Sequence, residues 1–114
     1  WGIYNGNLTN GTSTCNGSAN TALMPSSYQA VTWVYSLGDG WYLPAIDELN
    51  ILYWNRYHVN KSGVSGLTLL SYGYYWSSTE YSRNEAFSLN FFTGYADFEQ
   101  SKSLSYKVRA IRSF

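Results

Sequence analysis

The side chains that could catalyse a reaction or hold a metal are few and far apart. His58 is the single histidine and Cys15 the single cysteine, so the ligand pairs typical of zinc sites are missing. Asp47 and Glu48 are adjacent in a predicted helix, where they point in different directions and cannot flank one bond. Catalysis needs groups that exchange protons, attack or bind a metal at short range. We therefore expect a protein that is not an enzyme and that uses no metal or other cofactor.

Glu80 is the one carboxylate within a run of aromatic and small polar residues, YWSSTE, at 75–80. The two serines of this run have no candidate base, and the chain has no glycine-rich phosphate loop. We expect Glu80 to accept hydrogen bonds from nearby backbone or from an arginine. Arg109 and Arg112 are expected to form structural ion pairs or backbone contacts, with Glu80 as a candidate partner.

The composition indicates a binding surface. The chain contains 12 Tyr, 5 Trp and 5 Phe, and Ser and Asn are abundant. Tyr, Trp, Ser and Asn together are typical of adaptable binding surfaces such as antibody loops. An aromatic-rich β core accounts for much of the Trp and Phe, but 12 tyrosines exceed what a core of this size needs.

The bulk properties limit the class of protein. A chain of 114 residues predicts one domain, residues 1–114. Its formal net charge of +0 argues against nucleic acid, which favours a basic face. No apolar run approaches the length of a membrane span, so we expect no membrane insertion. Cys15 is expected to be exposed and unpaired.

The N-terminal segment is expected to be poor in regular structure. Residues 1–38 carry no charged side chain, and residues 1–25 form a loop-rich segment. A Gly/Asn/Ser/Thr-rich loop is predicted for residues 5–20, with a short strand at 2–4. The missing charge is compatible with a surface that lies against something, such as a neighbouring subunit, or with a flexible arm.

Two helices and several strands are predicted after this segment. Ser26 and Gln29 fit a capping box for the first helix, whose apolar stripe is Tyr28, Val31, Val34, Tyr35 and Leu37, and residues 38–40 end it. The second helix follows Pro44, with the stripe Ile46, Leu49, Leu52, Tyr53 and Tyr57.

Period-two alternation begins at Ser71. It directs Phe87, Leu89 and Phe91 to one face and Ser88, Asn90 and Phe92 to the other. Further strands are expected at 95–99 and 106–112. Two helices followed by short antiparallel strands predict an α+β domain.

Two ordered motifs resemble one known family. The first motif is Gly40-Trp41-Tyr42-Leu43-Pro44 with Glu48-Leu49. The second motif is Tyr75-Trp76-Ser77-Ser78-Thr79-Glu80, followed by Ala86-Phe87, Asn90-Phe91, Gly94, Lys102 and Val108–Arg112. Together they resemble the C-type-lectin-fold variable proteins of diversity-generating retroelements, a fold family that also includes the C-terminal domain of bacterial collagen-like adhesins. The resemblance runs from about residue 26 to residue 114.

The resemblance implies a C-type lectin fold without a disulfide and a hypervariable surface. In such proteins a reverse transcriptase copies a template with errors at adenines, so that template Asn codons come to encode Tyr, Ser, Asp, Phe and others while scaffold residues stay fixed. The implied ligand-binding residues lie within a variable region at 75–107 and would share one face: Tyr81, Ser82, Arg83, Ser88, Phe92, Thr93, Tyr95, Asp97, Phe98, Gln100, Ser101, Ser103, Leu104 and Tyr106.

The resemblance also implies where the domain acts. It would bind a host or cell-surface protein or glycan, and it would be displayed extracellularly on a phage tail fibre or a bacterial surface protein. The alternative is a fixed trimerisation or adhesin capping module that binds polysaccharide. No Glu-Pro-Asn, Gln-Pro-Asp or Trp-Asn-Asp triplet of calcium-dependent lectins is present, so the fold alone does not imply sugar binding.

The chain departs from the family pattern at three places. Phe87 stands where the family usually has Trp, and Ala45 stands where Thr or Ser usually caps the helix. The stretch from Asp97 to Ser101 is about a residue longer than usual.

Overall fold

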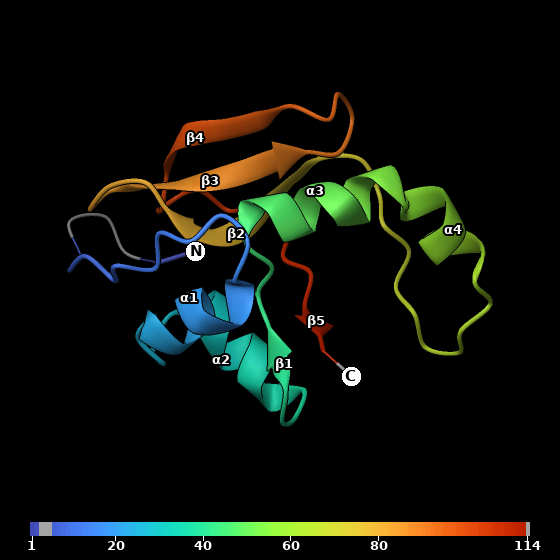
Figure 1. The fold of residues 1–114 in the computed structure, drawn as a ribbon, viewed down its shortest axis with the longest axis horizontal. Helices are drawn as coiled ribbons and strands as arrows, with labels where there is room; N and C mark the ends of the chain where they lie inside the picture. The colour runs from blue at the N-terminus through green and yellow to red at the C-terminus, as the bar shows by residue number, and fades with distance from the viewer. Residues whose placement is uncertain (3–5, 114) are drawn as a thin grey trace.

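Three antiparallel strands from the second half of the chain form the larger sheet (Figure 1). The structure is a computed structural model that describes residues 1–2 and 6–113. The strands are β2 (Tyr74–Glu80), β3 (Glu85–Asn90) and β4 (Ala96–Ser101), in the order β2-β3-β4. The alternation that begins at Ser71 therefore predicted the region of all three strands.

The pairing of β3 with β4 is irregular at one point. Ser88 lies opposite Asp97 and Ala86 lies opposite Gln100, so β4 has one more residue than β3 between these pairs, as in a β-bulge. The bulge falls in the stretch from Asp97 to Ser101 that the sequence marks as long.

A second, two-stranded sheet pairs β1 (Trp41–Tyr42) with β5 (Ile111–Arg112). The last strand was expected over residues 106–112, but only its end is a strand. Lys107 instead forms an isolated parallel bridge with Tyr75 at the outer edge of β2. The bridge directs the C-terminal segment past the large sheet toward β1.

Four helices complete the α+β domain over the described residues: α1 (Gly17–Leu23), α2 (Gln29–Ser36), α3 (Ile46–Trp54) and α4 (Arg56–Lys61). None of them, within that part of the chain, has the length and apolar character needed to cross a membrane.

Helix α1 corrects the expectation of a loop over residues 5–20. Asn16 caps the helix, because its side chain accepts a hydrogen bond from Ala19 N at 3.0 Å. A Cβ at Gly17 would lie 2.4 Å from Leu43 O, so only glycine allows the helix to begin so close to the backbone at 43–45. The strand expected at residues 2–4 falls largely on residues outside those described.

Helix α2 begins later than its predicted capping box. Its N-cap is Tyr28, with no side-chain cap, because residues 25–28 form a separate turn in which Tyr28 N donates to Pro25 O. Ser26 is therefore not the cap. Tyr28, Val31 and Val34 are buried as expected, whereas Tyr35 and Leu37 are exposed.

The second predicted helix is two helices. Ile46, Leu49 and Tyr53 are buried along α3, which confirms that stripe, but the chain turns at Asn55. Tyr57 consequently lies on α4 and is exposed.

Other parts of the chain replace the missing cap of α3. Ala45 offers no acceptor, so Ile46 N donates to Thr79 Oγ1 of β2 at 3.0 Å and Asp47 N donates to Thr14 O at 2.8 Å. The Glu48 carboxylate accepts from Ala45 N at 2.8 Å. Three otherwise unpaired N–H groups of the helix start are thereby satisfied.

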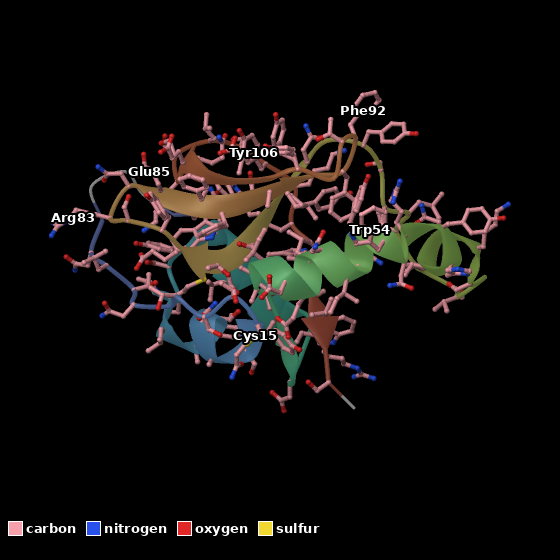
Figure 2. The ribbon with its side chains drawn as sticks, turned by 45° about the horizontal axis from the view of Figure 1, so that its top comes forward. Cys15, Trp54, Arg83, Glu85, Phe92 and Tyr106 are labelled. Carbon is pink, nitrogen blue, oxygen red and sulfur yellow. The ribbon has the colours of Figure 1, made fainter. Side chains whose placement is uncertain are left out.

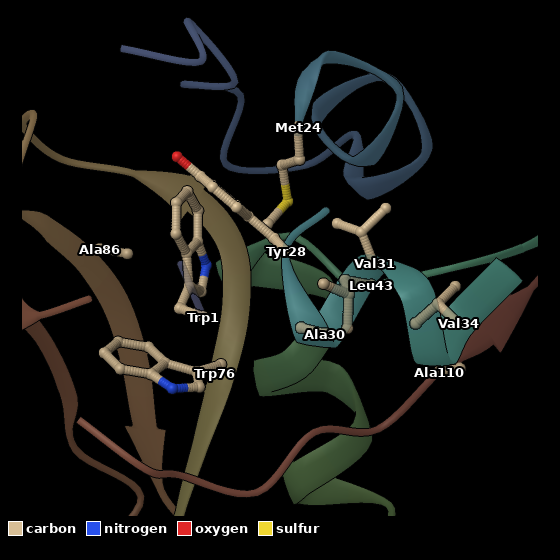
Figure 3. Close-up of a cluster of buried hydrophobic side chains, with 10 residues drawn as sticks. All are labelled: Trp1, Met24, Tyr28, Ala30, Val31, Val34, Leu43, Trp76, Ala86 and Ala110. Carbon is tan, nitrogen blue, oxygen red and sulfur yellow. The ribbon is translucent and has the colours of Figure 1, made fainter. Parts of the chain in front are cut away.

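Buried apolar side chains form one cluster on each face of the large sheet. In the first cluster, Trp76 and Ala86 pack with Trp1, Tyr28 and α2 (Figure 3). In the second, Tyr75, Leu89 and Phe91 pack with α3. Because successive strand residues point to opposite faces, the neighbours Tyr75 and Trp76 anchor the two clusters.

The uncharged N-terminal segment lies along its own β2. Glu80 N donates to Gly11 O at 2.8 Å, and Thr79 Oγ1 donates to Ser13 O at 2.9 Å. Thr9 and Asn20 are buried. The flexible-arm interpretation is therefore wrong for residues 6–24, and contacts within the chain account for much of the missing charge.

Thr79 should be a sensitive position because one hydroxyl serves two distant segments. Thr79→Val keeps the shape but leaves Ile46 N unpaired and leaves Ser13 O with only its bond from Asn20 Nδ2, and we expect it to lower the free energy of unfolding by about 2 kcal/mol. Thr79→Ser keeps the hydroxyl and loses one methyl, at a cost of about 1 kcal/mol. Urea denaturation measures both; a Val variant as stable as the Ser variant would contradict this role.

Candidate ligand-binding surface

A buried ion pair holds together the segments that carry most of the predicted site. Lys102 Nζ lies 2.6 Å from Glu80 Oε2, and both side chains are buried. Glu80 also accepts hydrogen bonds from Thr9 N and Asn10 N at 3.0 Å. Lys102 donates to Arg83 O at 3.0 Å and lies 4.5 Å from the centre of the Trp1 ring. We call this group the Glu80–Lys102 clasp.

The clasp corrects the expected partner of Glu80. The backbone donors are confirmed, but the cation is Lys102. Arg109 donates to Thr68 O, and the Arg112 guanidinium lies over the half-buried Trp41 ring at 5.4 Å. β1 and β5 form the other sheet, so residues 109 and 112 follow a path that leads away from the end of β2.

The carboxyl of Glu80 is held in its ionised form. Burial alone would raise its pKa, but the Lys102 hydrogen bond, the Thr9 N–H, the Lys102 charge and the Asn10 N–H together lower the pKa below its usual range. The Glu80 carboxylate is therefore charged at neutral pH, and its partner Lys102 holds the loop at 81–84 through bonds to Arg83 O and Asn84 O.

A second arrangement, the Tyr106 network, lies over the face of the sheet that carries Trp76. The Tyr106 ring stacks on Tyr74 at 4.9 Å and lies 4.7 Å from the Trp76 ring. Tyr106 Oη donates to Gln100 Oε1 at 2.5 Å, and Gln100 Nε2 donates to Asp97 Oδ2 at 2.7 Å. Burial, then the nearby Tyr74 and Asp97, raise the pKa of Tyr106, so its hydroxyl stays a donor at neutral pH.

Tyr81 and Phe98 lie on the opposite face. Their rings are 4.9 Å apart, and both contact Phe87, which packs against the α3 cluster. Asp97 pairs with Ser88 and Ser88 with Trp76, and paired residues of antiparallel strands share a face. The predicted set therefore does not form one face but is divided between the two sides of the sheet.

The turn between β3 and β4 presents a third group. Phe92 and Tyr95 are 69% and 76% exposed, and Phe92 makes an edge contact with Tyr72 at 5.3 Å. Thr93 Oγ1 accepts from Tyr95 N at 3.3 Å. Gly94 has φ +77°, and a Cβ there would lie 2.8 Å from the Tyr53 ring, so the turn needs glycine to sit on α3.

The remaining predicted residues lie near the clasp, in the loop after β2 and at the end of β4 with the loop that follows it. Ser82 donates to the Glu85 carboxylate at 2.8 Å, and Arg83 is exposed. Figure 2 shows Arg83 and Phe92 at opposite ends of the large sheet, with Tyr106 between them. The hydroxyls of Ser101 and Ser103 are hydrogen-bonded to each other at 2.8 Å, and Leu104 is exposed.

Ser88 does not belong to the accessible surface. It was expected to be exposed because it points away from Leu89, but it is fully buried and its Oγ has no hydrogen-bond partner. The alternation is correct in direction. Ser88 is nevertheless buried because it lies between Trp76 and Asp97 in the centre of the sheet, on the side that the Tyr106 ring covers.

Tyr74 is the residue of this surface that sequence reasoning missed. It is partly exposed and stacks on Tyr106. The sequence position of Tyr74 could have predicted this, because a strand residue two positions before Trp76 points to the same face of the sheet.

A groove adjoins the Tyr106 network. It has a volume of about 710 Å³ and lies between α2 and residues 102–108, with Tyr28 and Trp33 on one side and Leu104 and Tyr106 on the other. This volume is in the usual range for ligand sites. Within residues 1–2 and 6–113, no three His, Cys, Asp or Glu side chains lie close enough together to hold a metal ion.

Comparisons with protein-family models, with curated proteins and with solved structures found no match to this chain.

The Glu80–Lys102 clasp should make the free energy of unfolding depend on pH in the acid range. Its depressed pKa means that Glu80 contributes stability above the unfolded-state value near ~4.3, and that this contribution is lost as pH falls through the folded-state pKa. We expect urea midpoints between pH 7 and 3 to fall less steeply in the double variant Glu80→Gln/Lys102→Met than in the wild type. Asp39→Asn, at an exposed carboxylate, is the matched control and should keep the wild-type slope.

The single variant Glu80→Gln should be the least stable at pH 7. It leaves Lys102 charged and buried without its partner, which costs about 3–5 kcal/mol, whereas the double variant removes the unpaired charge and should recover part of the loss. If Glu80→Gln is as stable as the wild type at pH 7, the clasp does not stabilise the fold.

Proposed function

We propose that this protein is a binding domain with a C-type lectin fold whose diversified surface recognises a protein or glycan on a host or cell surface. The proposal rests on one structural observation. Between residues 75 and 110, side chains at the sheet centre and the clasp are buried while the residues interspersed with them are exposed or half-buried. Such a chain can change its surface without changing its core.

The exposed side chains have the chemistry of a recognition surface. Tyr81, Phe92, Tyr95 and Phe98 are large aromatic residues with much of their surface open to solvent. Aromatic residues of this kind supply much of the energy of protein interfaces. Asp97 and Gln100 form a hydrogen-bonded polar pair on the face of the sheet that carries Trp76, which supplies directional contacts.

The burial of the motif residues beneath this surface supports the proposed resemblance. The motif residues Trp76, Glu80, Ala86, Phe91 and Lys102 are all buried, as expected of scaffold positions. The proposed variable positions are mostly exposed or half-buried, with Ser88 as the exception. Short helices that precede a sheet of antiparallel strands are compatible with a C-type lectin fold, and display on a phage tail fibre or a bacterial surface protein is the setting that the resemblance implies.

Diversification makes a genomic prediction. We expect a near-identical template repeat of the gene's 3′ end and a reverse-transcriptase gene close to it. The differences between the two copies should fall at template adenines and at codons within 75–107. Sequencing the locus tests this directly. A locus without a template would remove the diversification mechanism.

Tolerance to substitution should differ between the exposed positions of the surface and the buried positions beneath it. A library randomised at eight exposed positions (Tyr81, Arg83, Phe92, Thr93, Tyr95, Phe98, Ser103 and Leu104) should remain mostly folded, because exposed side chains usually change stability by only about 0.5 kcal/mol. The matched library randomises eight buried positions of the same region (Tyr75, Trp76, Ser78, Ala86, Leu89, Phe91, Lys102 and Ala110) and should be almost entirely unfolded. Protease resistance on a display surface measures both, and equal survival would contradict the proposal.

A further inference from the structure

The charges of this neutral chain are unevenly distributed along it. No Asp or Glu occurs between residues 49 and 79, although this stretch contains Arg56, Lys61 and the single histidine. Four of the seven carboxylates lie between residues 80 and 99. The zero net charge therefore conceals a basic region centred on α4.

A groove lies in this basic region. It has a volume of about 600 Å³ and is bordered by α4 on one side and residues 70–72 on the other. Buried Leu70 and Phe91 contribute apolar surface to its lining, and two tyrosines contribute to its walls. Tyr57 is 66% exposed and Tyr72 is 69% exposed, so much of each side chain is open to a ligand.

Two cations border the groove without acidic partners. The Arg56 guanidinium stacks on the Tyr53 ring at 4.0 Å and donates one hydrogen bond to Tyr53 O at 2.7 Å, which leaves most of its five N–H donors available. Lys61 Nζ lies 5.9 Å from the Tyr57 ring centre. No described carboxylate comes within ion-pair distance of either cation.

The groove is held in shape before any ligand binds. Asn60 of α4 is hydrogen-bonded to the opposite wall, residues 70–72. Its Nδ2 donates to Leu70 O at 2.9 Å and its Oδ1 accepts from Leu70 N at 2.7 Å. Ser71 N donates to Tyr75 Oη at 3.2 Å, and Lys107 Nζ donates to Ser71 Oγ and Tyr72 O. A preformed site loses little conformational entropy on binding.

These contacts also determine which kind of ligand fits. A peptide that adds to a wall as a strand needs free backbone groups, but Leu70 N, Leu70 O, Ser71 N and Tyr72 O are already bonded within the chain. A small inorganic anion would make no use of two tyrosine rings. A sugar ring that carries a carboxylate or sulfate uses both features, because its C–H face packs on aromatic rings and its acid group pairs with guanidinium and ammonium.

We propose that the groove between α4 and residues 70–72 binds an acidic sugar unit of a glycan. The sugar ring packs against Tyr57 and Tyr72, and Arg56 and Lys61 bind its acid group. None of these four residues belongs to the proposed variable set, so the groups that bind the sugar would be retained if the variable positions changed. One variable residue, Phe92, contacts Tyr72 at the border of the groove.

The test is an NMR titration of the ¹⁵N-labelled protein with trigalacturonate and with a heparin-derived tetrasaccharide, which distinguish carboxylate from sulfate. Maltotriose is the neutral control and sodium sulfate the ion control. We expect at least one acidic oligosaccharide to shift the amides of α4 and residues 70–73, with an affinity at least tenfold above both controls.

Charge-removing variants assign the binding to the groove. Arg56→Gln and Lys61→Gln should each weaken binding about tenfold, the loss expected for one charge-assisted hydrogen bond. Arg112→Gln removes an exposed cation outside the groove and outside the proposed variable set, and it should leave the affinity unchanged. The proposal is overturned if neither acidic oligosaccharide binds, if maltotriose or sulfate binds equally well, or if the two groove variants bind like the wild type.

Discussion

The Glu80–Lys102 clasp ties the uncharged N-terminal segment to the large sheet. One carboxylate and one ammonium join the N-terminal segment at Thr9 and Asn10 to the end of β2, the 81–84 loop and the residue after β4. A buried ion pair is worth little relative to an apolar pair of the same shape, because both ions lose water. Its hydrogen bonds nevertheless require one arrangement of these segments. We therefore expect the clasp to contribute more to the uniqueness of the fold than to its total stability.

Other polar side chains also form hydrogen bonds that connect segments distant in the sequence. Thr79 connects the start of α3 with Ser13, and Thr21 accepts from Leu43 N at 3.1 Å while donating to Gly17 O at 2.7 Å. Ser77 donates to Phe87 O across the sheet at 2.8 Å. A domain with short helices and two-residue strands satisfies fewer backbone groups through regular structure, so small hydroxyl residues within the core must satisfy the rest. The abundance of Ser, Thr and Asn in this chain thus has a structural cause as well as the functional one inferred from its composition.

Local patterns predicted what local forces decide. The stripe of Ile46, Leu49 and Tyr53 is buried along α3, and Phe87, Leu89 and Phe91 share the face of the sheet that packs against α3, so both predicted directions are confirmed. The errors arose where the partner is distant in sequence. The cap of α3 comes from Thr79, and the cation of Glu80 is Lys102, not an arginine. Ser88 points in the predicted direction, but it is buried beside Trp76, on the face where the Tyr106 ring packs. Periodicity gives the direction of a side chain, whereas its exposure depends on which segment later crosses that face.

The division of the surface has a physical consequence for recognition. The Tyr106 network and the Tyr81–Phe98 pair lie on opposite faces of one thin sheet, so a flat partner cannot contact both fully. A partner that approaches the edge strand β4 could contact both, because Asp97 and Phe98 are neighbours that point to opposite sides of that strand. Glu99 is exposed there, and the bulge interrupts the ladder, which disfavours continuation of the sheet by another strand. Recognition at this edge would therefore rely on side chains from both faces, and side chains are the part of the edge that can vary while the strand pairing beneath them stays the same.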